Sequence, residues 1–432
     1  MQPALLIRLR PAGPWRYGPG DGALDRTDTL YRSDRLYSAL SLAMRQLGAL
    51  DEWLDATARA PHPAATFSSL FPYQSETLFA VPPAVAWPPP PNQVRAPNSI
   101  FLAKIRWKTA HFVPLSVIES LITGGAVLAD QWAPDPESGC LLRRDRPSSP
   151  PFRIVTRKSA AVDRLARMSA AESSSACVEF EPGAGLWSIC RFADEAARDA
   201  WSPRIEGAFR LLADDGFGGR RSQGWGHSES PVFERGQWPN MIMPRLGARE
   251  NNNGGSRFWL LSLYSPAGAD QVDWNSGDYR LAVRGGRVES PNGAPVSKKT
   301  LRMVTEGSVL VARLEPNGAA VDVAPENFAH PVYRSGLALA VELPLTIAAI
   351  EEVASERQAV EEPGSEEAVI EAVVPRLEEV PDEPEVAPEA EHVPGEEPPA
   401  IESSESVAPE IETPEIETPE TETPREDSGD AV

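Results

Sequence analysis

The chain of 432 residues has few of the side chains that most enzymes and metal sites require. It contains three cysteines and five histidines, none with the spacing of metal ligands, and it lacks a carboxylate cage, so we expect neither a metal ion nor another cofactor. The cysteines (Cys140, Cys177 and Cys190) do not suggest a disulfide framework, which favours the reducing cytoplasm.

Long apolar runs are also missing. The first eleven residues carry too short an apolar run for a signal peptide and predict a strand over Leu5–Leu9. The run Gly336–Ile350 contains Glu342 and Pro344, and it is shorter than the roughly 20 residues that cross a bilayer. We therefore expect a soluble protein without a membrane partner.

Negative charge is concentrated at the C-terminal end. Residues 351–432 hold 28 acidic residues and three arginines, a net charge of −25, so the body before them carries +3 although the whole chain is −22. The tail is rich in Glu and Pro and ends in the near-repeat Pro409–Pro424, a composition that predicts disorder. It serves as a solubilising segment, or it repels nonspecific nucleic acid or docks a partner.

A glycine-rich segment, Gly216–Gly226, is the most informative part of the body. Its sequence GFGGRRSQGWG combines five glycines, two arginines and two aromatic residues. Glycine lets backbone amides approach an anion, arginine forks suit phosphate, and an aromatic ring offers a stacking face to a base. It follows a predicted helix over 204–212, and we interpret it as a loop that grips a phosphate backbone rather than as a catalytic centre; the alternative is a flexible surface turn. The residues expected to form this grip are Gly216, Gly218, Gly219, Arg220, Arg221, Gly224 and the adjacent His227.

Two other kinds of glycine loop are excluded by the residues that come after the glycines. A Walker loop needs lysine and a hydroxyl after its last glycine, but Trp225 and Gly226 come after Gly224. A dinucleotide-binding loop needs a third glycine where Arg221 stands, and it opens a helix after a strand.

The remaining patterns predict strands mixed with a few helices, an α+β class built on ferredoxin-like units. Ser33 or Asp34 is expected to cap one helix, and a capping box formed by Ser116 and Glu119 is expected to start another. Residues 251–255 are expected to be a linker. A strand over 258–264 and hairpins around 285–286 and 317–318 are expected to follow it.

The glycine loop resembles the signature loop of the RAMP superfamily, the RNA-binding subunits of CRISPR systems. Further segments, taken in order, are similar to subunit four of the Csm complex, the type III-A effector, over about residues 1–345. They are YRSDRLYSAL (31–40), SSLFPY (68–73), IRWKTAHFVPL (105–115), VDRLARMSA (162–170), KKTLRMVTEGSVL (298–310) and HPVYRSGLAL (330–339). The acidic tail and residues 132–151 have no counterpart in this pattern.

The resemblance implies two ferredoxin-like (RRM-like) domains with insertions, over 1–250 and 251–345, followed by the disordered tail 346–432. It implies a non-catalytic subunit that holds the 5′ handle of the CRISPR RNA, with target RNA nearby. That subunit bridges the large cyclase-bearing subunit and the backbone RAMP subunit. The first domain would include a thumb-like hairpin and end with the glycine loop.

Two further basic sets fit RNA contact. Lys104, Arg106 and Lys108 alternate, as on one face of a strand, and a cluster in the expected hairpin includes Arg157 and Arg164. Two alternatives remain open: a metal-free ribonuclease that processes CRISPR RNA, and an assembly subunit that contacts proteins only. Among the histidines only His227 is placed for RNA chemistry, and we expect it to act as a simple hydrogen-bond donor instead.

Overall fold

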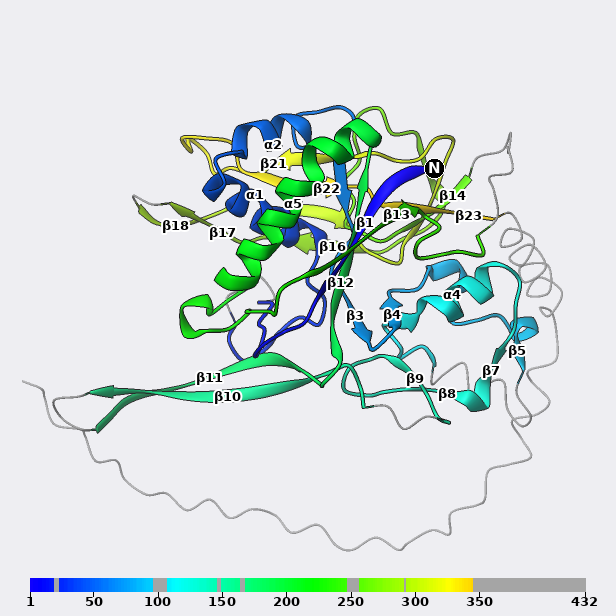
Figure 1. Cartoon of the computed structure of the whole chain (residues 1–432), viewed down its shortest axis with the longest axis horizontal. Helices are drawn as coiled ribbons and strands as arrows, with labels where there is room; N and C mark the ends of the chain where they lie inside the picture. The colour runs from blue at the N-terminus through cyan, green and yellow to red at the C-terminus, as the bar shows by residue number, and fades with distance from the viewer. Residues whose placement is uncertain are drawn as a thin grey trace, which may run out of the picture. The chain divides into compact units, whose positions relative to one another are not determined.

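Mainly antiparallel sheets and few helices make up the described part of the computed structural model, which confirms the predicted mixture of strands with a few helices (Figure 1). The described residues are 1–18, 23–95, 107–145, 149–163, 168–246, 256–290 and 293–344. The chain divides into two units, Met1–Pro363 and Gly364–Val432, and every described residue belongs to the first. The expected linker at 251–255 and the expected disorder of the tail lie outside the described residues.

The first sheet is formed by the N-terminal half. Its order is β13-β1-β12-β3-β4-β6, with β2 also paired to β12. The strands are β1 (Gln2–Leu9), β2 (Ala65–Phe67), β3 (Phe71–Gln74), β4 (Thr77–Ala80), β6 (Val113–Pro114), β12 (Ala184–Phe192) and β13 (Val232–Trp238). Two helices follow β1 and one follows β12, and the four principal strands lie in the order fourth, first, third, second, all antiparallel. This is the arrangement of a β-α-β-β-α-β unit.

Two amphipathic helices pack together beside this sheet: α1 (Ser33–Gln46) and α5 (Glu195–Asp215). Apolar residues at helical spacing, such as Ile205, Phe209 and Leu212 of α5, are buried, as expected for the helix predicted over 204–212. Helix α5 is longer than the predicted 204–212 because the side chain of Asp194 caps it, accepting from the Ala197 amide at 2.8 Å. The shorter helices are α2 (Leu50–Ala56) and α4 (Leu115–Ile122).

The two predicted caps are wrong. Arg32 occupies the N-cap position of α1, and Ser33 and Asp34 are the first helical residues, with side chains directed to other partners. Pro114 precedes α4, and the buried Glu119 carboxylate accepts from the Arg245 amide instead of closing a capping box. In both helices a tertiary contact has taken the side chain that local pattern assigned to a cap.

A second, four-stranded sheet is formed by the C-terminal half. Its order is β15-β20-β14-β23, from β14 (Ser256–Leu260), β15 (Val272–Asp278), β20 (Val309–Ala312) and β23 (Ala340–Leu343). The order again places the first strand between the third and the fourth. Between 256 and 344 the described residues form no helix, so the crossings between these strands are not helical there. That both halves are ferredoxin-like domains stays a prediction.

Both predicted hairpin turns in this half are wrong. Gly285–Gly286 lies within a long ribbon in which β16 (Leu281–Arg284) pairs with β19 (Leu301–Val304) and β17 (Arg287–Ser290) pairs with β18 (Gly293–Ser297). Asn317–Gly318 precedes β21 (Gly318–Asp322), which pairs with β22 (Tyr333–Leu337) rather than with the preceding strand. Glycines mark a bend in the first case and a strand start in the second, positions that also need glycine.

Smaller elements complete the N-terminal half. A two-stranded hairpin of β10 (Phe152–Asp163) and β11 (Met168–Phe180) extends away from the first sheet (Figure 1). Short pairs are β5 (Val94–Arg95) with β7 (Val127–Leu128), and β8 (Trp132–Pro134) with β9 (Leu141–Arg143), the latter within the segment that matched no family pattern. The 3₁₀ turns are η1 (Ala84–Ala86), η2 (Pro91–Gln93), η3 (Ala129–Gln131) and η4 (Arg221–Gln223).

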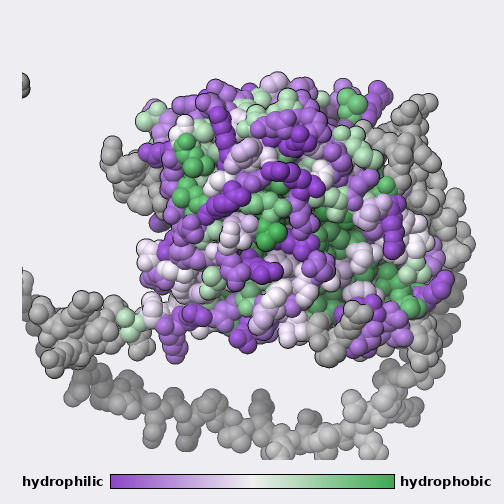
Figure 2. Space-filling view, in the orientation of Figure 1, coloured by the Kyte–Doolittle hydropathy of each residue, from purple (hydrophilic) through white to green (hydrophobic). Residues whose placement is uncertain are grey.

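One apolar core joins the two halves. Trp259, Val309 and Leu339 of the C-terminal half are fully buried in the same cluster as the residues of β1 and β12. The indole nitrogen of Trp259 also donates to the Val81 carbonyl at 3.1 Å. Hydrophilic side chains dominate the face shown in Figure 2, with smaller apolar patches between them. No helix in the described ranges is long and apolar enough to cross a membrane.

Candidate nucleic-acid interface

The glycine loop forms a tightly bonded turn after α5. Its backbone is left-handed at Gly216, Gly218, Gly224 and Gly226, and a Cβ at Gly218 would lie 2.4 Å from the Arg16 carbonyl oxygen. The amides of Phe217, Gly219 and Gly226 already donate to protein carbonyls at 2.9–3.0 Å. The expected row of amides directed at an anion is therefore not available at those positions.

The two aromatic residues of the loop face inward, contrary to the expected stacking role. Phe217 is fully buried and stacks on Trp15, and Trp225 is buried with the Arg220 guanidinium 5.5 Å from its ring centroid. Burial of apolar area outweighs display to a base here. These rings fix the shape of the loop.

The two arginines of the loop differ in their surroundings. Arg220 has a left-handed backbone and donates to the Gln223 side chain at 2.8 Å. Arg221 is exposed, and its positive charge opposes the rise in the pKa of buried Tyr31, which burial nevertheless raises to about 12. Arg221 is thus the loop residue best placed to meet an anion.

Arg221 lines a cleft of about 690 Å³ between the glycine loop, the start of α1 and the C-terminal ribbon. The loop contributes Gly216, Gly218 and Gly219, and α1 contributes an apolar wall that includes Ala39 and Leu42. Seven cationic side chains and one carboxylate, Asp34, line this cleft. The cations are Arg16, Arg35, Arg221, Arg284, Arg287, Lys298 and Arg334.

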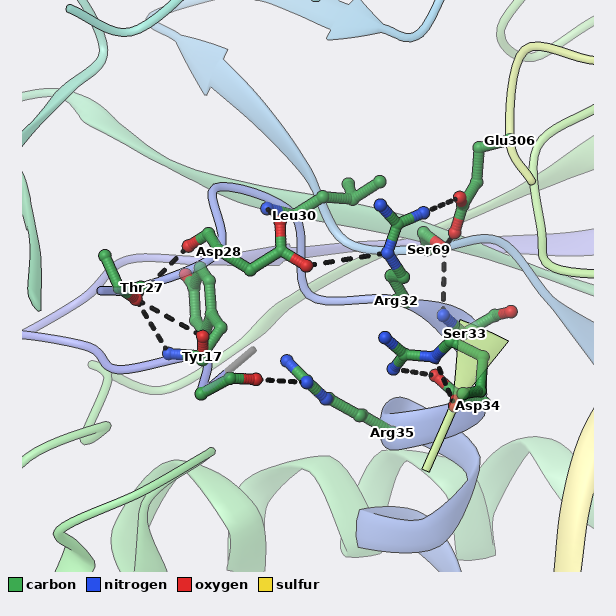
Figure 3. Close-up of polar contacts among 12 residues, drawn as sticks. Tyr17, Thr27, Asp28, Leu30, Arg32, Ser33, Asp34, Arg35, Ser69 and Glu306 are labelled. Atoms are coloured by element: carbon green, nitrogen blue, oxygen red, sulfur yellow. Dashed lines mark hydrogen bonds and ion pairs between the residues drawn. The ribbon is translucent and has the colours of Figure 1, made fainter. Parts of the chain in front are cut away.

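The first turn of α1 joins the two halves of the body. The Asp34 carboxylate accepts from Arg284 at 2.9 and 3.0 Å and also from Arg334, and all three side chains are buried. Figure 3 shows Asp34 turned toward an arginine while Arg35 points the other way, toward the segment after Tyr17. The Arg35 guanidinium donates to the Gly18 carbonyl.

The residues on either side extend this junction. The Arg32 guanidinium pairs with the buried Glu306 carboxylate, which also accepts from the Ser69 hydroxyl (Figure 3). The Ser33 hydroxyl accepts from the Leu263 amide at 3.0 Å. Three consecutive residues, Arg32, Ser33 and Asp34, therefore bond the N-terminal half to the C-terminal half beside the cleft.

Burial and charge oppose each other at this junction. Burial alone would raise the pKa of Asp34, but Arg284 and Arg334 outweigh it and hold that pKa below its ordinary value. Burial, followed by repulsion from Arg284, lowers the pKa of Arg35. The site therefore keeps Asp34 ionised and crowds positive charge around it.

The other described residues predicted to bind RNA do not line the cleft. The backbone carbonyl of His227 accepts from the Ala12 amide and the Trp15 indole, both at 3.0 Å. Lys108 is exposed in a turn rather than on a strand, and Arg157 on β10 pairs with Glu179 at 2.6 Å. Lys104, Arg106 and Arg164 lie outside the described residues. Among the described residues no group of histidine, cysteine and carboxylate side chains is arranged to hold a metal ion.

Sequence reasoning missed the arginines of the cleft that come from other segments. Arg35 lies in the YRSDRLYSAL segment and Arg334 in HPVYRSGLAL, so the motifs contained the signal. Their joint position follows only from the packing of α1 against β22 and the ribbon, which sequence spacing does not encode.

Comparisons with known proteins agree with these motifs. Residues 253–343 match the family model of the CRISPR Csm4 C-terminal domain. No curated protein matches the chain.

A chain of the Csm3-Csm4 subcomplex in the type III-A CRISPR-Cas interference complex has the same fold, with a TM-score of 0.51 and 14% identity, covering 79% of this chain and 99% of that one. A chain of a Csm1-Csm4 cassette in complex with pppApA aligns with a TM-score of 0.48 and 16% identity, over 79% of this chain and 98% of that one. The resemblance seen in the sequence is confirmed.

Proposed function

We propose that this chain, a RAMP protein of the Csm4 kind, is a non-catalytic RNA-binding subunit of a type III-A CRISPR effector. In that role it holds the 5′ handle of the CRISPR RNA and bridges the cyclase-bearing subunit, Csm1, and the backbone subunit, Csm3. Target RNA passes nearby. Both halves of its body act as ferredoxin-like units, the first with the β10–β11 hairpin as its thumb.

The cleft carries the RNA part of this proposal. Seven cations and one carboxylate line it, a charge balance suited to a polyanion. Arg221 and Arg287 are exposed there, while Ala39 and Leu42 supply an apolar wall against which a sugar or base packs. Single-stranded nucleic acid is bound by this combination of a positive groove with apolar contact.

The bridging part rests on the relatives. A solved structure of the same fold contains Csm4 together with Csm3, and other solved structures contain Csm4 together with Csm1. A protein that meets one partner on each side while gripping RNA needs a rigid body. The shared core and the buried ion pairs between the halves of this chain supply that rigidity.

Fluorescence anisotropy with the full chain and labelled handle RNA tests the RNA grip. We expect Arg221→Ala to weaken binding about tenfold, the loss of one charge-assisted contact, and to flatten the dependence of log K on log salt by about 0.7. The matched control is Arg313→Ala, an exposed arginine that does not line the cleft, which should bind like the wild type. Equal affinity of the Arg221 and Arg313 variants would contradict the grip.

The two alternatives predict different outcomes in the same experiment. An assembly subunit that contacts proteins only would bind handle RNA no better than unrelated RNA, and its affinity would not respond to Arg221. A processing ribonuclease would convert the labelled RNA to shorter products on incubation.

A further inference from the structure

Three arginines and one carboxylate meet where α1 faces the C-terminal half. Arg284 and Arg334 share the single carboxylate of Asp34. Arg35, the next residue along α1, lines the same cleft and donates to a neutral carbonyl, that of Gly18. This group of four therefore carries more positive than negative charge.

The excess charge is poorly compensated by what the described residues provide. The Nη1 atom of Arg35 is buried and has no hydrogen-bond partner among them. Burial and the nearby Arg284 both act against the charged form of Arg35 and lower its pKa. The carboxylates of Asp34 and Asp28 favour the charged form but do not outweigh these effects. A partly buried, imperfectly paired cation is costly, and an anion entering the cleft would reduce that cost.

The cleft gives such an anion a path and a second set of contacts. Arg287, which follows Gly285–Gly286 in the ribbon, and Arg221 of the glycine loop are both exposed and line the same cleft. They come from opposite halves of the body. An anion between them would be held by both halves, in the cleft that Asp34 and Arg35 also line.

We propose that the cleft holds a phosphate site built across the two halves. Its ligands are Arg35, Arg221 and Arg287, and Asp34 is the residue that positions Arg284 and Arg334 beside them. Guanidinium forks match the geometry of phosphate oxygens. The bound group is one phosphate, either of an RNA backbone or of a free mononucleotide. Its assignment to RNA rests on the proposed function, whereas its phosphate chemistry does not.

Thermal unfolding of the full chain in inorganic phosphate tests the site without RNA. At matched ionic strength in chloride and phosphate, we expect the wild-type midpoint to rise with phosphate concentration, because a ligand that binds the native state stabilises it. Arg35→Gln keeps a donor for the Gly18 carbonyl but removes the charge, so its midpoint should not respond. Arg287→Gln, on the exposed rim, is a second variant that does not depend on buried packing. Arg313→Gln is the control and should respond like the wild type.

RNA and mononucleotide arms identify the source of the phosphate. If the ligand is RNA, Arg35→Gln should lose about tenfold in affinity for single-stranded RNA and about 0.7 in salt slope, and AMP should not compete. If it is a free mononucleotide, AMP should raise the wild-type midpoint but not that of Arg35→Gln. Either result supports a phosphate site.

The proposal and the RNA function fail in distinguishable ways. Phosphate that shifts wild type, Arg35→Gln and Arg287→Gln equally, or shifts none of them, would overturn the site even if handle RNA binds normally. A phosphate response that Arg35→Gln abolishes would support the site even if handle RNA does not bind and the proposed function falls.

Discussion

The ring of Phe217 stacks on the ring of Trp15, with centroids 4.9 Å apart and planes 15° from parallel. This pair joins the glycine loop to the segment after β1, where the Trp15 amide and carbonyl also bond to Val178. The loop that forms one wall of the cleft is thus anchored from inside the core.

Truncation of this anchor should destabilise the protein. We expect Phe217→Ala to lower the free energy of unfolding by about 3–5 kcal/mol, because the ring is fully buried and its loss leaves a cavity. Urea denaturation measures the change. Leu314→Ala, at a side chain that is 77% exposed, is the control and should change little. A loss below about 1 kcal/mol for Phe217→Ala would show that the loop tolerates repacking.

Two adjacent glycines should respond differently to alanine. A Cβ on Gly219 meets nothing closer than the Arg16 carbonyl oxygen at 3.9 Å, so Gly219→Ala should keep its stability while its methyl group hinders RNA approach. Gly218→Ala should unfold more easily, because its φ is +77° and its Cβ would clash with backbone. Anisotropy and urea denaturation, measured on both variants, separate the effects.

Gly207 provides the control for this comparison. It lies inside α5, and a Cβ there meets only Leu47 at 3.8 Å, so Gly207→Ala should gain up to about 1 kcal/mol and bind RNA normally. Unaltered RNA affinity of Gly219→Ala would mean that RNA does not approach the loop at this residue.

Loss of the Asp34 charge should be severe. Asp34→Asn leaves Arg284 and Arg334 buried without their counter-ion, and we expect a loss of about 3–5 kcal/mol in the free energy of unfolding. Asp55→Asn, which breaks the exposed pair with Arg59, should cost less than about 1 kcal/mol. Similar losses of unfolding free energy for Asp34→Asn and Asp55→Asn would indicate that the charges of Arg284 and Arg334 are compensated by something other than Asp34.

The same carboxylate predicts how stability depends on pH. The pKa of Asp34 is lower in the folded than in the unfolded protein. Its ionised form therefore adds fully to the free energy of unfolding above the unfolded pKa of about 3.9, and this contribution disappears as pH falls through the folded pKa. The difference in unfolding free energy between wild type and Asp34→Asn should therefore be constant at neutral pH and shrink below about pH 4. A difference that stays constant under acidic conditions would contradict the lowered pKa.

His227→Ala should leave target RNA degradation by a reconstituted effector intact, apart from any assembly defect. The structural contribution of His227 is made by its backbone carbonyl, which the substitution retains. Gel analysis of labelled RNA checks this. Cleavage by the purified wild-type chain that His227→Ala removes would reverse the non-catalytic proposal.

Deletion of residues 351–432 should increase the affinity of the chain for unrelated single-stranded RNA at low salt. The deletion removes a net charge of −25, and long-range repulsion of a polyanion falls with it. The difference should shrink as salt rises, since exposed charges are screened over about 8 Å at physiological ionic strength. Equal affinities at low salt would leave the tail as a solubilising segment.

The sequence predicted elements well where one local pattern decided them. The strand at Leu5–Leu9 and the helix before the glycine loop were found because a short apolar run and helical spacing are local properties. Prediction from the sequence failed where a residue had two suitable partners. Ser33 and Asp34 both fit a helix cap, yet Ser33 bonds to the distant Leu263 amide and Asp34 to two distant arginines. The glycine loop was identified, but whether Phe217 faces a ligand or the core depends on Trp15, about 200 residues away in sequence.

The shared core has a consequence for biosynthesis. The first sheet is complete once β13 ends at Trp238, but the C-terminal residues that share its apolar core, from Trp259 to Leu343, are made later. At roughly 5–20 residues per second, the remaining hundred or so residues take about 5–20 s to synthesise. During that interval the nascent chain carries an uncovered apolar surface, so we expect its yield in cells to depend on chaperones that act during translation.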